Sequence, residues 1–162
     1  MCRRLLYLVA ITALVGALVV PAFAQDSEMA THQIVRVSEL EFADIQPEGF
    51  DPGMKIASLL GDPSVADEPY VIRLSFEEGY RFPPHYHPKA ENLTVLSGEL
   101  LLAMGEMADE SQLQSYTAGD VLHIPPTHPH FGGAATETVI QLHGVGPFEI
   151  LLVNPPTAVE EK

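Results

Sequence analysis

Proline and glycine recur at short intervals between residues 46 and 147, and this spacing is what most constrains the fold. The 162-residue chain holds 14 prolines and 12 glycines. Many of them cluster in turn signals, which stand at residues 46–49, 51–53, 61–63, 83–84, 125–126 and 144–147. After position 25 no stretch of twelve residues keeps a clean helical stripe, because prolines interrupt each candidate. The pattern therefore excludes a fold built from long helices.

Short apolar or alternating runs lie between these turn signals. They cover residues 33–40, 54–60, 70–76, 93–96, 99–104, 113–116, 121–124, 138–143 and 148–153. Short runs separated by turn residues are typical of strands in an all-β sandwich or barrel. Because no repeat, low-complexity block or interior linker breaks the series, we expect a single compact domain from about residue 33 to residue 153.

Residues 1–24 have the pattern of a secretory signal peptide. Arg3 and Arg4 precede an uncharged apolar run over residues 5–20, and small residues lead to a cleavage site after Ala24. An uncleaved membrane anchor is the alternative, since the apolar run approaches the length of a spanning helix. The arginine pair leaves both the general secretory and the twin-arginine routes open. Cleavage predicts a mature domain of residues 25–162, periplasmic or secreted, with no stable membrane association.

The mature chain is strongly acidic and has no cysteine. Eight basic residues face 22 acidic ones. Loss of Arg3 and Arg4 leaves six basic residues and a net charge of −16. Such a balance repels phosphate backbones and anionic lipids, so nucleic-acid binding is excluded. Cys2 lies in the signal segment, which leaves no thiol for a disulfide or a metal ligand.

Five of the seven histidines fall between residues 85 and 130. His85 and His87 share one face if the segment is a strand, so both imidazoles can reach a single ion. Glu91 follows four residues later and can complete the set. His130 is a further candidate, with His128 as its alternative two residues earlier.

In the segment 79–98, five residues separate Gly79 from His85 and one separates His85 from His87. Three more precede Glu91, and six lie between Glu91 and Gly98. This resembles in full the first motif of the cupin superfamily. The second cupin motif is matched in part by residues 119–134, where His130 fills the histidine position. Thr127 stands where glycine is usual and Ala134 where asparagine is usual. Residues 60–64 and 143–148 are also similar to a group of small single-domain bacterial cupins.

The resemblance implies an all-β, double-stranded β-helix, or jelly-roll, cupin barrel. It also implies one metal ion held by His85, His87, Glu91 and His130. Three imidazoles with one carboxylate suit a divalent transition metal ion, namely Mn, Fe, Ni, Co, Cu or Zn, and do not suit Ca or Mg. Four protein ligands in six-coordinate geometry leave two positions open for water or a small molecule.

Six further residues are candidates for contacts with the metal ligands or with a substrate. His123 and His143 either line the cavity or are core histidines, and His128 is a rim residue unless it replaces His130. Arg81 either clamps a substrate carboxylate or forms a surface ion pair. Phe82 and Phe131 are either cavity walls or core residues.

Two functions fit these features. The first is a metal-dependent enzyme acting on a small-molecule substrate, of the dioxygenase, lyase or isomerase type found among cupins; the four filled ligand positions favour it. The second is a non-catalytic cupin that binds or senses a small molecule or a metal. Exposed strand edges, together with the resemblance, also predict a homodimer that uses part of residues 33–60.

Overall fold

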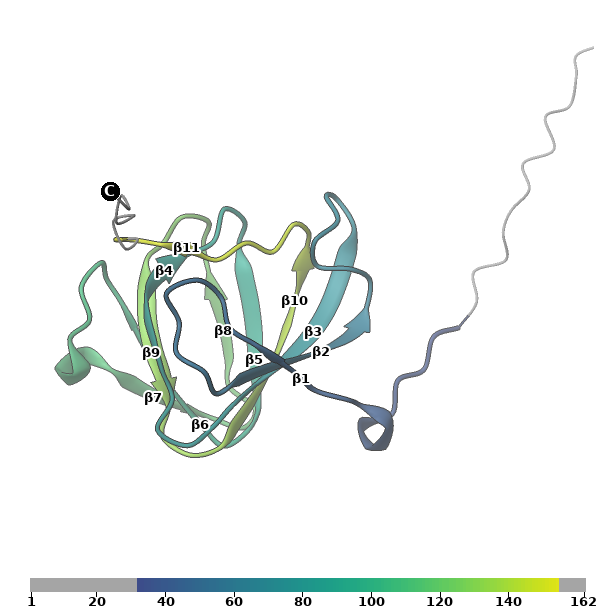
Figure 1. Ribbon diagram of the computed structural model, residues 1–162, viewed down its shortest axis with the longest axis horizontal. Coiled ribbons are helices and arrows are strands. Elements are labelled where there is room, and N and C mark those ends of the chain that lie inside the picture. Colours follow the sequence, from purple (N-terminus) through teal and green to yellow (C-terminus); the bar gives the residue numbers. More distant parts are fainter. Residues whose placement is uncertain (1–31, 155–162) are drawn as a thin grey trace, which may run out of the picture. The chain divides into compact units, whose positions relative to one another are not determined.

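The computed structural model describes residues 32–154, which form two antiparallel β-sheets facing each other (Figure 1). The predicted signal peptide, residues 1–24, lies outside the described residues. No helix within residues 32–154 has the length and apolar character needed to cross a membrane. Two short 3-10 helices, η1 (Val37–Glu39) and η2 (Glu110–Gln112), complete the secondary structure of the described chain.

The first sheet has six strands and the second has five. In spatial order the first contains β1 (Ala43–Ile45), β2 (Met54–Leu60), β3 (Pro69–Phe76), β10 (Thr138–Val145), β5 (Glu91–Ser97) and β8 (Val121–Ile124). The second contains β11 (Leu151–Leu152), β4 (Arg81–Tyr86), β9 (His130–Ala134), β6 (Glu99–Met104) and β7 (Gln114–Thr117). This arrangement confirms the predicted all-β jelly-roll barrel.

Alternating side chains of the strands fill the space between the sheets. In β3 every second residue is buried, among them Ile72 and Leu74. Val95 of β5 and Leu142 of β10 are fully buried in the same cluster. Burying one such side chain contributes roughly 1.5–3 kcal/mol relative to leaving it exposed. The period-two pattern of the sequence thus marks the inner face of the barrel correctly.

Residues 33–40 do not form the strand that their composition predicts. They contain η1 and an extended coil, with Ile34 and Val37 exposed to 74% and 73%. Apolar content favours a strand only where a neighbouring strand supplies hydrogen bonds and cover. Pairing begins only at β1, which lies along β2.

Strand β4 runs through Pro83 and Pro84, which the sequence analysis interpreted as a turn. Proline cannot donate a ladder hydrogen bond, and it is tolerated in a strand where the pairing is irregular. The register between β4 and β9 shifts between Phe82 and His85, across both prolines. This irregular pairing brings His85 opposite His130.

Strand β9 lies outside the apolar runs that the sequence analysis interpreted as strands, and it contains the Gly132–Gly133 pair. A Cβ atom on Gly132 would lie 2.0 Å from the carbonyl oxygen of Leu101, and one on Gly133 equally close to that of Tyr80. The neighbouring backbones therefore approach β9 more closely than any side chain allows. In this strand glycine is required by packing and does not mark a turn.

Candidate metal centre

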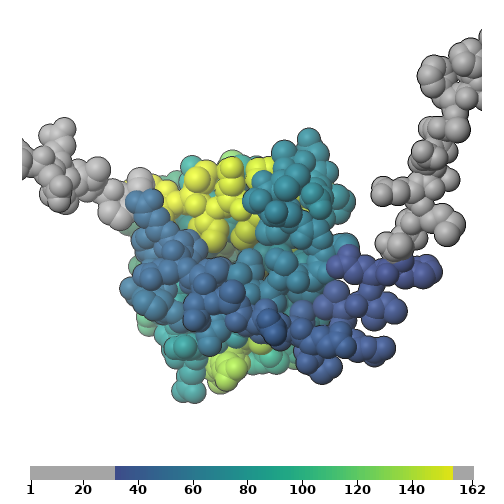
Figure 2. Space-filling model, turned by 45° about the vertical axis from the view of Figure 1, so that its right-hand side comes forward, coloured from purple at the N-terminus to yellow at the C-terminus, as the bar shows by residue number. Residues whose placement is uncertain are grey.

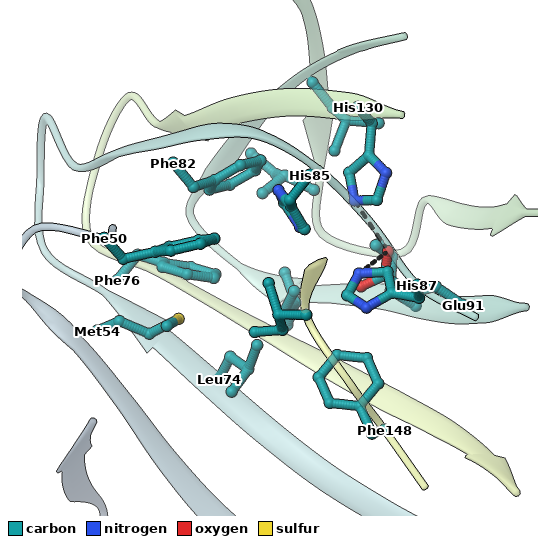
Figure 3. Close-up of a pocket in the computed structure, with 15 residues that line it drawn as sticks. Phe50, Met54, Leu74, Phe76, Phe82, His85, His87, Glu91, His130 and Phe148 are labelled. Atoms are coloured by element: carbon teal, nitrogen blue, oxygen red, sulfur yellow. Dashed lines mark ion pairs between the residues drawn. The ribbon is translucent and has the colours of Figure 1, made fainter. Parts of the chain in front are cut away.

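Two sheets bring four polar side chains together inside one end of the barrel (Figure 3). His85 lies near the end of β4 and His87 directly after it. His130 begins β9 and pairs with His85 across the ladder, so the two side chains share the inner face. Glu91 begins β5 in the opposite sheet, after the short turn that follows His87. All four side chains are buried.

The three imidazoles converge on one point. Their ring centroids are 4.3 Å apart for His85 and His130, 5.1 Å for His85 and His87, and 5.3 Å for His87 and His130. One nitrogen of each ring lies within 4.8 Å of those of the other two. These three residues can hold a metal ion.

Backbone carbonyls set the tautomer of each ring. Nδ1 of His85 is 2.8 Å from the oxygen of Pro83, Nδ1 of His87 is 2.7 Å from that of Glu149, and Nδ1 of His130 is 3.1 Å from that of His128. Because a carbonyl oxygen only accepts, each Nδ1 must carry the proton and donate. In the neutral ring, Nε2 then presents a lone pair, which is the form that binds metals.

Glu91 faces the same point without a satisfactory partner. Its Oε2 lies 3.5 Å from Nε2 of His87 and 3.3 Å from Nε2 of His130. Among the described residues, the buried His87 Nε2 and Glu91 Oε2 have no hydrogen-bond partner of acceptable geometry. Lone pairs of two imidazoles and a carboxylate facing one another are unfavourable unless a cation lies between them. The donor set therefore fits a divalent transition metal ion.

The surroundings of His85 and Glu91 shift their pKa values in the directions that favour metal binding. Burial and the neighbouring His130 lower the pKa of His85 to about 3, against the opposing effect of the Pro83 carbonyl. Burial acts to raise the pKa of the Glu91 carboxyl, but His130 and His87 together lower it well below its usual range. At neutral pH His85 is uncharged and Glu91 is ionised.

A narrow cavity adjoins the nitrogen atoms, and the space within it that the centre of a water molecule can reach is about 30 Å³. Its walls come from both sheets and from two loop segments. Phe148 stacks on His87 with centroids 4.6 Å apart, and Phe50 meets His85 edge-on at 5.3 Å. Figure 3 shows Phe50, Phe76 and Phe82 gathered on one side of the histidines and Phe148 on another. The centre therefore lies in a mainly hydrocarbon pocket.

Comparison with known protein families identifies the type of barrel. Residues 72–145, which contain all four convergent side chains, match the cupin domain. The barrel has the cupin fold. Within it, Thr127 keeps the left-handed backbone of the usual glycine, with φ of 60°. Threonine thus adopts here a backbone conformation that favours glycine, and His130 reaches the centre.

Three solved structures illustrate this cupin likeness. The polyketide cyclase RemF from Streptomyces resistomycificus has a TM-score of 0.65 at 17% identity, covering 78% of this chain and 89% of that one. KdgF from Halomonas sp. has a TM-score of 0.54 at 18% sequence identity, and the match covers 72% of this chain and 96% of that one. An RmlC-like cupin from Shewanella frigidimarina has a TM-score of 0.52 at 18% sequence identity, and the match covers 70% of this chain and 89% of that one. At these identities the likeness concerns the fold. A search of curated proteins found no match to this sequence.

The other histidines and Arg81 lie away from the cupin cavity. His123, His128 and His143 are exposed, so the predicted cavity or core positions of His123 and His143 are wrong. Leu122, Ile124 and Leu142 are buried, and strand alternation turns the intervening histidines outward. Nδ1 of His123 contacts Oδ1 of Asn92 at 2.7 Å.

Arg81 forms the surface ion pair that was one of its two predicted roles. Its Nε lies 3.4 Å from Oε1 of Glu110. Phe82 lines the cavity. Phe131 is buried but faces the other side of β9, towards Gly105, and does not line the cavity.

Sequence reasoning missed Phe50 and Phe148 as cavity walls. Both lie in loops: Phe148 belongs to the run 148–153 that was interpreted as a strand, of which only Leu151–Leu152 forms one. Each is a single aromatic residue directly after a turn residue, Gly49 or Pro147. An aromatic side chain placed inside a turn cluster is the signal that could have identified them.

Proposed function

We propose that this chain is an exported metalloprotein in which His85, His87, Glu91 and His130 hold one divalent transition metal ion. The observation that carries the proposal is the common tautomer of the three histidines, each with Nδ1 bonded to a carbonyl and Nε2 turned inward. Four protein ligands leave room at the ion for a small molecule entering from the cavity. A structural ion would normally have a closed shell.

Metal analysis of purified residues 25–162 tests this proposal. We expect close to one divalent ion per chain by elemental analysis. His85→Ala combined with His87→Ala should abolish binding, whereas His123→Ala with His143→Ala serves as a matched control on the outer surface. Full metal content in the first double variant would contradict the assignment.

We favour an enzymatic role for the bound ion. It would act as Lewis acid or as dioxygen activator for a small organic substrate, in dioxygenase-, lyase- or isomerase-like chemistry. A dioxygen-uptake screen of the metal-loaded protein with catechols, thiols and oxo-acids tests for this role. Turnover that disappears in His130→Ala would support it.

Non-catalytic ligand binding is the second candidate, and the cavity itself favours it. Among the described residues, the titratable side chains lining the cavity are the proposed ligands alone. No separate group is therefore placed to transfer a proton to or from a bound molecule. Metal-dependent binding without turnover in the same screen would select this function.

Export and dimerisation are part of the proposal. Residues 33–60 include exposed apolar side chains, such as Phe42 and Leu60, and strand β1 at a sheet edge, which supports a homodimer through this region. Light scattering at micromolar concentration should give twice the chain mass. Mass spectrometry of the exported protein should find Gln25 at its N-terminus, and an intact Met1 in a membrane fraction would support an anchor instead.

A further inference from the structure

The chemistry of the cavity walls restricts what can bind beside the histidines. Apart from the four convergent polar side chains, the wall consists of aliphatic, aromatic and thioether groups. Met54, Leu74, Phe76, Phe82 and Ile140 are each less than 9% exposed. In the described part of the chain, no lysine, arginine, hydroxyl or amide side chain lines this cavity. A ligand therefore meets hydrocarbon everywhere except at the proposed ion.

The basic residues nearest in sequence to the ligands are occupied outside the cavity. Arg81 pairs with Glu110 on the outer surface. Lys89 contacts the carbonyl of Gly146 and lies 3.6 Å from a carboxylate oxygen of Asp67. Neither side chain lines the cavity. A carboxylate directed away from the ion would be buried without a partner, which is costly.

The charge of the centre favours a singly ionised ligand. The three imidazoles are neutral in the tautomer set by the carbonyls, and Glu91 supplies one negative charge. A divalent ion with this set retains one positive charge. A monoanion brings the buried centre to neutrality, whereas a dianion leaves a net negative charge among hydrocarbon walls.

Two aromatic rings flank the histidines and give the cavity flat walls. Phe148 stacks on His87 with 21° between the ring planes, and Phe82 meets His85 at 83° with centroids 5.5 Å apart. Resting on the proposed function, we infer that the cavity takes a flat, mainly hydrocarbon molecule that chelates the ion through two adjacent oxygens carrying one negative charge. Small dicarboxylates and other polyanions are excluded by the same walls.

Three chelators of graded character test this inference on Co²⁺-loaded residues 25–162. Tropolone is a flat monoanion, 4-isopropyltropolone adds hydrocarbon, and oxalate is a polar dianion. Each apparent affinity, read from the visible Co²⁺ spectrum, is divided by that chelator's affinity for Co²⁺ in free solution. We expect tropolone to exceed oxalate by at least about tenfold on this scale, and the isopropyl group to add up to about tenfold. Oxalate equal to or above tropolone would overturn the inference.

Matched variants separate the wall from the ion. Phe148→Ala should lower the corrected tropolone affinity several-fold and leave that of oxalate unchanged; Phe148→Leu serves if the alanine variant does not fold. Arg81→Gln, on the outer surface, should change neither. A loss of oxalate binding in Arg81→Gln would show a cation reaching the ligand and would contradict the inference. If no chelator alters the spectrum, the ion is closed to ligands and the proposed function itself fails. If oxalate alone alters it, only the inference fails.

Discussion

Phe148 stacks on the metal-facing His87, with ring centroids 4.6 Å apart, and the next residue along the chain bonds the same imidazole through its carbonyl. The segment after β10 thus walls the cavity and also sets the tautomer of a proposed ligand. It is held in place by the backbone bond from Phe148 to the Pro63 carbonyl, at 2.7 Å. Figure 2 shows this C-terminal segment, in yellow, beside the blue N-terminal strands on one face of the barrel.

Phe148→Ala should destabilise the metal-free protein by about 2 kcal/mol, because it removes a half-buried ring from contact with His87 and Tyr70. Urea unfolding followed by circular dichroism measures the change. Met107→Ala is the control, since Met107 is 81% exposed, and should cost under about 0.5 kcal/mol. Equal losses in the two variants would contradict the packing role.

Glu91→Gln should weaken metal binding by about 10- to 100-fold while the fold survives, because it keeps the shape but removes the charge that balances the ion. Competition with a chromophoric chelator measures the affinity. Glu149→Gln, which alters an exposed carboxylate and keeps the carbonyl that binds His87, should have no effect. Unchanged affinity in Glu91→Gln would remove Glu91 from the ligand set.

Thr127→Gly should stabilise the protein by up to about 1 kcal/mol, because Thr127 holds a left-handed backbone with φ of 60°. A β-branched residue pays about 1–2 kcal/mol for this conformation, and glycine does not. The gain is reduced by the greater entropy of the unfolded chain. Thr136→Gly, at an exposed bend without positive φ, should destabilise instead, and thermal unfolding distinguishes the two.

The metal-free protein should lose stability as the pH falls from about 6.5 towards 3. Burial holds the pKa of His85 near 3 in the folded state, below its ordinary value of 6.5. The unfolded chain therefore binds an extra proton in this window, and the free energy of unfolding decreases by up to about 1.4 kcal/mol for each pH unit. The full contribution is present above pH 6.5.

Urea titrations at several pH values measure this slope. His85→Asn should flatten it, whereas His143→Asn, which alters an exposed histidine, should leave it unchanged. A slope that persists in His85→Asn would assign the effect to another group.

Local sequence pattern was sufficient for regular strands such as β3 and β5 and for the pair His85 and His87. Alternation along β3 and β5 marks their buried faces because successive side chains of a strand point to opposite sides. The same rule places His85 and His87 on one face, and the motif spacing adds Glu91 and His130. Alternation depends on neighbours within a few residues, which the sequence displays directly, whereas His130 was identified by its resemblance to the second cupin motif.

The walls of the cavity were decided only by the tertiary structure. Phe50 and Phe148 are nearly a hundred residues apart and lie in loops, yet both contact the histidines. Pro83 and Pro84 enter a strand because the ladder to β9 is irregular there. The glycines of β9 are required by the close backbones of Tyr80, just before β4, and of Leu101 in β6. His123 and His143 turn outward because Leu122 and Leu142 occupy the interior. The position of each of these residues depends on which distant segment packs against it. Such contacts across the barrel produce no periodic pattern in the sequence.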